Sequence, residues 1–156
     1  MDIISLLEKN KDKVIEDSCK QINEVKLKGY TKVGSSITKQ KLTSLYKKVI
    51  ECANKKELIP MLNYTEKIAK ERFASGYDLH EVQTAINALE ENIWQIIFKN
   101  IKPEKLAESL GLVSSILGAG KDNLTRNYVA LATQTKASTI NLQSLLSSNE
   151  SIADNG

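Results

Sequence analysis

The sequence predicts an all-α fold, a single-domain bundle of six or seven helices. Apolar residues recur every three or four positions along nearly the whole chain, which is the helical period. No stretch of the sequence shows the strict apolar–polar alternation of a half-buried strand. The chain has 156 residues, of which 41% are hydrophobic and only 2 are proline. This length supports one sizeable core, and the low proline content permits long helices.

The N-terminal part of the chain predicts two or three helices and one loop. Apolar spacing covers residues 3–26, and a polar gap inside this range indicates one bent helix or two short ones. Residues 27–36 contain two glycines and are typical of a loop. The next helix starts near Ile37 and carries apolar residues on one side. Three residues are candidate N-caps for it: Ser35, Ser36 and Thr38.

The clearest local signal is a predicted corner between the third and fourth helices. Pro60 suits the first turn of the third helix, where a missing N–H costs nothing. Gly76 suits the left-handed position just after that helix, and Tyr77 follows it. Asp78 and Glu81 then have the spacing of a capping box at the start of the fourth helix. We therefore expect one helix to stop and the next to begin within a few residues.

Arg72 is expected to fix this corner. It stands one turn before Gly76 and could pair with Glu66, Asp78 or Glu81. A structural role is favoured over ligand binding for this arginine. The predicted structural corner consists of four residues: Arg72, Gly76, Asp78 and Glu81.

The second half of the chain predicts a central helix, a fifth helix and a polar C-terminal segment. A broad apolar stripe runs from Leu79 to about Ile101 and predicts burial on more than one side. Pro103 opens the next helix, and Gly118-Ala119-Gly120 predicts either a bend or close contact with another helix. Residues 123–156 include four charged residues and 16 Ser, Thr, Asn or Gln. We therefore divide the chain into a domain, residues 3–135, and a polar tail or linker helix, residues 136–156, disordered from about Ser148.

The sequence predicts no catalytic residues, no cofactor site and no metal site. His80 is the single histidine, and its place just after a helix cap favours an exposed residue over a haem ligand or a general base. Cys19 and Cys52 have neither a CxxC partner nor a neighbouring histidine, which favours a reduced, cytoplasmic chain. No apolar run approaches the 18 residues of a membrane span, so we expect no membrane insertion.

Two sets of residues remain as candidates for binding. Trp94, Phe98 and Tyr128 are candidates to line an apolar pocket, although aromatic residues at helical spacing more often belong to a core. A thin apolar seam predicts a homodimer interface near the C-terminus. Its members are Leu124, Tyr128, Leu131 and Leu142.

The charge of the chain is uneven. Residues 1–56 carry 13 lysines and 7 acidic residues, whereas residues 57–156 carry 9 basic and 12 acidic residues. The lysines are interrupted by acidic residues and no aromatic residues stand between them for base stacking. We therefore interpret them as solvated helix faces, and nucleic acid is not an expected partner.

The segment from Ile68 to Val82, IAKERFASGYDLHEV, resembles a helical corner of a known family. It is similar to the pattern x-R-x-x-x-G-x-(S/D)-L-x-E of the N-terminal domains of RsbT co-antagonists (RsbR and RsbRD). The opening residues 6–15, LLEKNKDKVI, and the closing residues 122–129, DNLTRNYV, are also similar to that family. The resemblance covers roughly residues 3–135.

This resemblance implies a globin-like helical sensor domain that binds no haem and has no catalytic activity. Such domains form dimers and interact with other signalling proteins in bacterial stress responses, in stressosomes and in some sensor kinases. Full-length members continue into an output domain, whereas residues 136–156 form a polar tail or the start of a linker. Kinase partners and phosphorylation sites are therefore not carried over from the family.

Three hypotheses of function follow. The leading one is a non-enzymatic sensory or protein-interaction domain that dimerises through its terminal helices. The first alternative is a globin-like protein that binds a small ligand or a tetrapyrrole. The second alternative is a basic helical module that binds nucleic acid.

Overall fold

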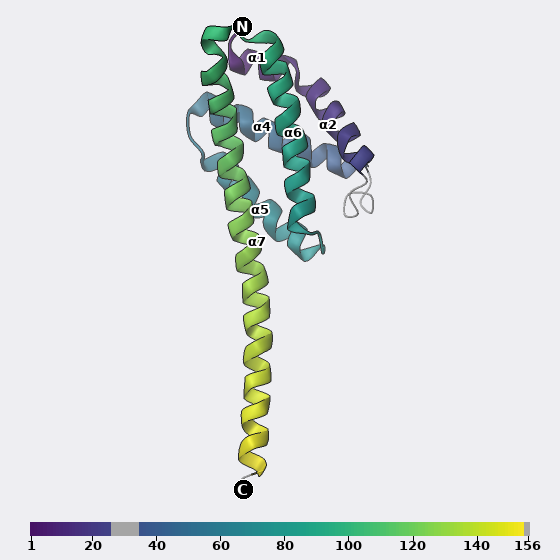
Figure 1. Cartoon of the computed structure of the whole chain (residues 1–156), viewed down its shortest axis with the longest axis vertical. Coiled ribbons are helices and arrows are strands. Elements are labelled where there is room, and N and C mark those ends of the chain that lie inside the picture. The colour runs from purple at the N-terminus through teal and green to yellow at the C-terminus, as the bar shows by residue number, and fades with distance from the viewer. Residues whose placement is uncertain (26–34, 155–156) are drawn as a thin grey trace.

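The computed structural model of the chain describes residues 1–25 and 35–154, with side chains for residues 1–25 and 38–134. Every regular element in these ranges is an α-helix, which confirms the predicted all-α class. The helices are α1 Ile3–Lys9, α2 Lys11–Val25, α4 Ser35–Lys55, α5 Ile59–Ala74, α6 Leu79–Asn100 and α7 Pro103–Asp154 (Figure 1). Most of the loop expected at residues 27–36 lies outside the described residues.

Helices α6 and α7 lie side by side and run in opposite directions, with α4 and α5 crossing behind them (Figure 1). Two polar contacts join this pair. Lys121 Nζ lies 3.1 Å from Glu90 Oε1, and Gln83 Nε2 donates a hydrogen bond of 2.8 Å to Thr125 Oγ1. The short antiparallel connection at residues 101–102 places the two helices in direct contact.

Helix α6 is the centre of the core, as its broad apolar stripe predicts. Nine of its 22 residues are buried, and they include Leu89, Ile93 and Ile97 with almost no exposure. The same core takes in α1 and α4, where the buried phenol of Tyr46 donates a hydrogen bond to the carbonyl of Leu7. Burial of these side chains is the main favourable contribution to folding.

The N-terminal region forms two short helices rather than one bent helix. Helix α1 ends at Lys9 and α2 begins at Lys11, and Asn10 marks the break. Asp2 caps α1 by accepting a hydrogen bond of 3.0 Å from the backbone N–H of Ser5. The expected N-caps of the next helix are placed differently. Helix α4 begins at Ser35, so Ser36 and Thr38 lie within the helix.

Helix α7 is continuous from Pro103 to Asp154, so the break predicted at Gly118-Ala119-Gly120 is wrong. The alternative, close contact with another helix, holds at Gly120. A Cβ atom at this position would lie 2.9 Å from both Cγ and Sδ of buried Met61 on α5. Asn123 reinforces the contact by donating to the Leu62 carbonyl at 2.9 Å and to Thr65 Oγ1 at 3.1 Å. Tertiary packing thus holds a helix that local propensity would weaken.

The boundary drawn between residues 135 and 136 falls inside α7, which crosses it without a break. The helix also passes Ser148, where disorder was expected, and reaches Asp154. Its 52 residues correspond to about 78 Å at the helical rise. The C-terminal part of α7 extends far beyond the other described helices (Figure 1).

The glycines of α7 provide a matched test of this packing. Gly120→Ala should lower the free energy of unfolding by about 1–3 kcal/mol, because the new methyl overlaps Met61. Gly111→Ala and Gly118→Ala, where the added Cβ meets open space, should raise it by about 0.5–1 kcal/mol through helix propensity. Urea unfolding followed by circular dichroism measures all three. Equal gains at the three positions would contradict the close contact between α5 and α7.

Candidate functional site

The corner between α5 and α6 is built as the sequence predicts. Gly76 has a φ of 81°, which places it in the left-handed region that favours glycine. Its N–H donates to the carbonyl of Phe73 at 3.1 Å, and the N–H of Tyr77 donates to the carbonyl of Arg72 at 3.0 Å. These two bonds form a Schellman motif that satisfies the last carbonyls of α5. The chain direction is therefore fixed at residues 75–78.

Asp78 is the N-cap of α6, but the predicted capping box is only half formed. The Asp78 carboxylate accepts a hydrogen bond of 3.2 Å from the N–H of His80, whose side chain is exposed as expected. The reciprocal bond from the Asp78 N–H to the Glu81 carboxylate is absent among the described residues. Glu81 Oε2 is instead buried and accepts no hydrogen bond within the described part of the chain.

Arg72 contacts an aromatic ring rather than the predicted carboxylates. Its guanidinium carbon lies 4.7 Å from the centroid of the Tyr77 ring, within the range of a cation–π contact. Of the three expected partners, Glu66 pairs with Lys70 at 3.1 Å, while Asp78 and Glu81 act as described above. Arg72 is only 6% exposed, and its buried guanidinium lies against this ring.

An aromatic cluster connects this corner to α7. The rings of Phe73 and Tyr128 meet edge to face, with centroids 6.0 Å apart and planes at 82°. Tyr128 also donates a long hydrogen bond of 3.5 Å to the carbonyl of Tyr77. Tyr128 therefore holds α7 against the corner through two contacts, one with the Phe73 ring and one with the Tyr77 carbonyl.

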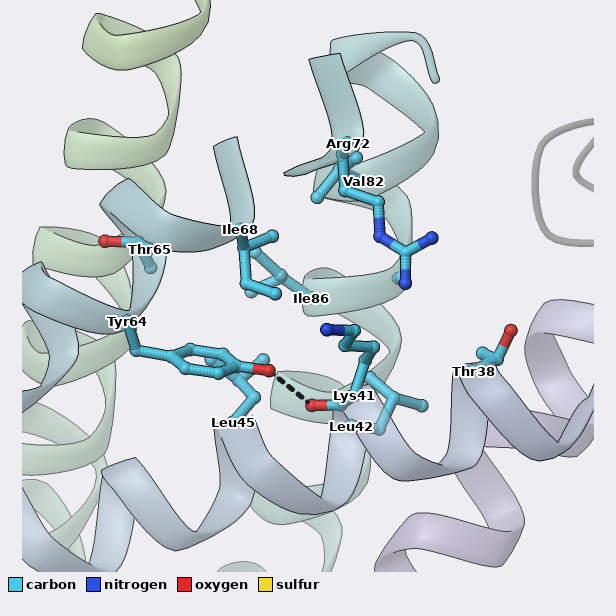
Figure 2. A pocket seen from close by; sticks show the side chains of 11 residues that line it. Thr38, Lys41, Leu42, Leu45, Tyr64, Thr65, Ile68, Arg72, Val82 and Ile86 are labelled. Atoms are coloured by element: carbon cyan, nitrogen blue, oxygen red, sulfur yellow. Dashed lines mark hydrogen bonds between the residues drawn. The ribbon is translucent and has the colours of Figure 1, made fainter. Parts of the chain in front are cut away.

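A cavity of about 30 Å³ lies between α4, α5 and α6 (Figure 2). One part of its wall is apolar and consists of Leu42, Leu45, Ile68, Val82, Ala85 and Ile86. The other part is polar and consists of Thr38, Lys41, Tyr64, Thr65 and Arg72. The guanidinium of Arg72 points from α5 toward α4, and the side chain of Lys41 rises from α4 toward α5 (Figure 2). Two cations thus approach the same space from opposite helices.

The polar wall is held by contacts across α4 and α5. Tyr64 donates a hydrogen bond of 3.0 Å to the carbonyl of Lys41 (Figure 2). Lys41 Nζ lies 2.7 Å from Glu71 Oε2, and this hydrogen bond holds the pKa of the Glu71 carboxyl below its usual value. Burial raises the pKa of Tyr64 to about 12, so the phenol keeps its proton at neutral pH.

The surface of this cavity is almost entirely apolar, because Arg72, Lys41 and the other polar residues of its wall line it mainly with their carbon atoms. About 30 Å³ corresponds to roughly two water molecules, whereas typical ligand sites measure roughly 300–1,000 Å³. The cavity is therefore far too small for a tetrapyrrole in this conformation.

The structure does not bring together the three residues of the predicted aromatic pocket. Tyr128 packs next to Tyr77, just before α6 begins, whereas Trp94 and Phe98 lie in its last two turns. Fifteen residues separate Leu79 from Trp94, which is about 22 Å along the helix. Phe98 is also 56% exposed. These residues belong to opposite ends of the bundle and cannot share one pocket.

The predicted dimer seam is largely used inside the chain itself. Leu124 is fully buried and Tyr128 is 5% exposed, because this face of α7 packs on the chain's own core. Leu131 is half-buried. The side chain of Leu142 lies outside the residues whose side chains the structure describes. The first two residues are therefore unavailable to a second copy while the domain is intact.

Sequence reasoning missed the cavity, although a signal for it exists. Thr65, Ile68 and Arg72 recur at helical spacing on α5, and Thr38, Lys41 and Leu45 do so on α4. On both α4 and α5, polar residues therefore occupy positions on the same helix face as buried apolar residues. Such a pattern marks positions where polar groups face the interior and need a partner.

No family model, curated protein or solved structure matches the chain. Within residues 1–25 and 38–134, no group of three His, Cys, Asp or Glu side chains gathers closely enough to hold a metal ion. None of the helices in the described part of the chain has the length and apolar character needed to cross a bilayer.

Alkaline pH should reveal the burial of Tyr64. Its folded pKa of about 12 exceeds the usual value of 10.0, so the folded chain binds this proton more tightly than the unfolded chain. Stability should be complete below about pH 10 and should be lost as the pH rises toward 12. Tyr64→Phe should reduce the slope of the free energy of unfolding against pH by up to one proton equivalent between about pH 10 and 12. Urea unfolding at several pH values in this range measures the slope. Identical slopes for the variant and the parent would show that this phenol is not protected by folding.

Proposed function

We propose that the chain is a non-enzymatic sensory or protein-interaction domain that acts as a homodimer in bacterial signalling. The observation that carries the proposal is the continuity of α7. Its first half is buried in the domain at Val113, Leu117 and Leu124, and its second half extends beyond the domain without a break (Figure 1). A change in packing inside the domain would therefore reach the far end of the same rigid element.

The resemblance of residues 68–82 to the RsbT co-antagonist family supports the same proposal. The corner that carries the resemblance is also the part of the fold that holds α7, through Tyr77 and Tyr128. By this resemblance the domain would be globin-like, cytoplasmic and without haem. Its partners would be other signalling proteins of a stress response, a stressosome or a two-component system.

A second copy would bind most readily to the uncovered surface of α7. Gly111 and Gly118, two helical turns apart, have open space where a side chain would stand, so the monomer offers no packing reason for either glycine. Val129 is 55% exposed on the same helix. Small residues allow close approach of a partner helix, and apolar ones favour it.

Analytical ultracentrifugation tests the dimer. The parent chain should sediment as a dimer at high micromolar concentration, and Gly111→Glu combined with Gly118→Glu should raise the dimer dissociation constant about tenfold or more. Both changes replace glycine with a better helix former in open space, so folding should persist in circular dichroism. Ile59→Glu, on a 59% exposed residue of α5, is the matched control and should leave the dimer intact. A monomeric parent would overturn the homodimer, and an unaffected double variant would place the interface elsewhere.

A further inference from the structure

We infer that Arg72 mechanically couples the cavity to the point where α7 leaves the domain. The inference builds on the proposed sensory function and assigns a residue to its transmission step. Arg72 is part of the cavity wall, and its guanidinium carbon lies 4.7 Å from the centroid of the Tyr77 ring.

The next link runs from Tyr77 to α7. The Tyr77 carbonyl accepts the hydrogen bond from Tyr128, and the ring of Phe73 closes on Tyr128 from α5. Phe73 is the neighbour of Arg72 in sequence, so both links start from the last turn of α5. A displacement of this turn therefore acts on Tyr128 along two routes.

Tyr128 is the last buried side chain of α7 in the described part of the chain. Residues 129, 130 and 132–134 are exposed, and Leu131 is half-buried. The contacts of Tyr128 are thus the last fully buried ones that act on the direction in which α7 leaves the domain. A shift of Tyr128 would therefore move the whole part of α7 that follows it.

The corner itself cannot absorb such a shift. The Schellman bonds at Gly76 and the Asp78 cap fix the backbone on both sides of Tyr77. A change of side-chain packing at Arg72 must therefore move Tyr77 together with the corner or repack the cluster around Tyr128. Packed clusters of this kind tend to switch between discrete arrangements and do not deform continuously.

A cavity-filling substitution can stand in for a bound ligand. Ala85 lies in the cavity wall, and Ala85→Val adds two methyl groups to a space of about 30 Å³ next to Arg72. These groups should hold the guanidinium against Tyr77 and slow the hydrogen exchange of the amides of residues 125–134 by roughly threefold or more. Arg72→Lys keeps the charge but lacks the planar group, so it should speed the same amides by roughly tenfold. In the Arg72→Lys background, Ala85→Val should no longer slow them.

Two internal controls separate coupling from a general change in stability. Helices α1 and α2 contribute no residue to the cavity wall, so their amides should exchange at the same rate relative to the parent in every variant. Lys41→Met removes the other cation of the cavity wall, which lies on α4 and pairs with Glu71, and should leave residues 125–134 unchanged. Tyr128→Phe, which loses the bond to the Tyr77 carbonyl, should speed these amides in the same direction as Arg72→Lys.

The inference is overturned if Ala85→Val slows α1, α2 and residues 125–134 alike, or if its effect persists with Lys at position 72. It is also overturned if Lys41→Met matches Arg72→Lys. The measurements are made on the chain carrying Gly111→Glu and Gly118→Glu, so that association of two copies does not protect α7. Failure of the homodimer in ultracentrifugation would therefore leave this test unaffected.

Discussion

The reversal of the chain at residues 75–78 is the constraint on which the rest of the structure depends. Gly76 in its left-handed conformation ends α5, and Asp78 starts α6 two residues later. Because the two helices are joined so tightly, α6 returns through the centre of the bundle and can be buried on most of its sides. The same reversal places Arg72 in the cavity wall and Tyr77 next to α7. One corner therefore positions residues of the cavity and of the contact with α7.

Local signals in the sequence predicted this part of the fold well. The left-handed position at Gly76, the cap at Asp78 and the helix start at Pro103 each follow from the chemistry of a single residue type. The continuity of α7 did not follow from such signals. Glycines at positions 118 and 120 weaken a helix locally, but the contact of Gly120 with Met61 and the buried neighbours on both sides outweigh that cost.

The candidate site was harder to predict because it depends on how helices cross. Trp94 and Tyr128 are both aromatic and apolar, yet the antiparallel course of α6 and α7 puts them at different levels of the bundle. Conversely, Lys41 and Arg72 are 31 positions apart and face one cavity only because α4 and α5 cross there. The charge pattern was simpler to interpret. Lys48 and Lys55 both pair with Glu51 at 3.1 Å, in line with solvated, ion-paired helix faces.

Because α7 is long, a small tilt near Tyr128 produces a large displacement at its far end. The 26 helical residues that follow Tyr128 span about 39 Å. A tilt of about 5° at that side chain would displace the far end by roughly 3 Å, more than half the rise of one helical turn. A repacking too small to change the volume of the core noticeably is thereby converted into a movement that is large on the scale of a side-chain contact. The fold thus converts a small change inside the bundle into a much larger one at a distance.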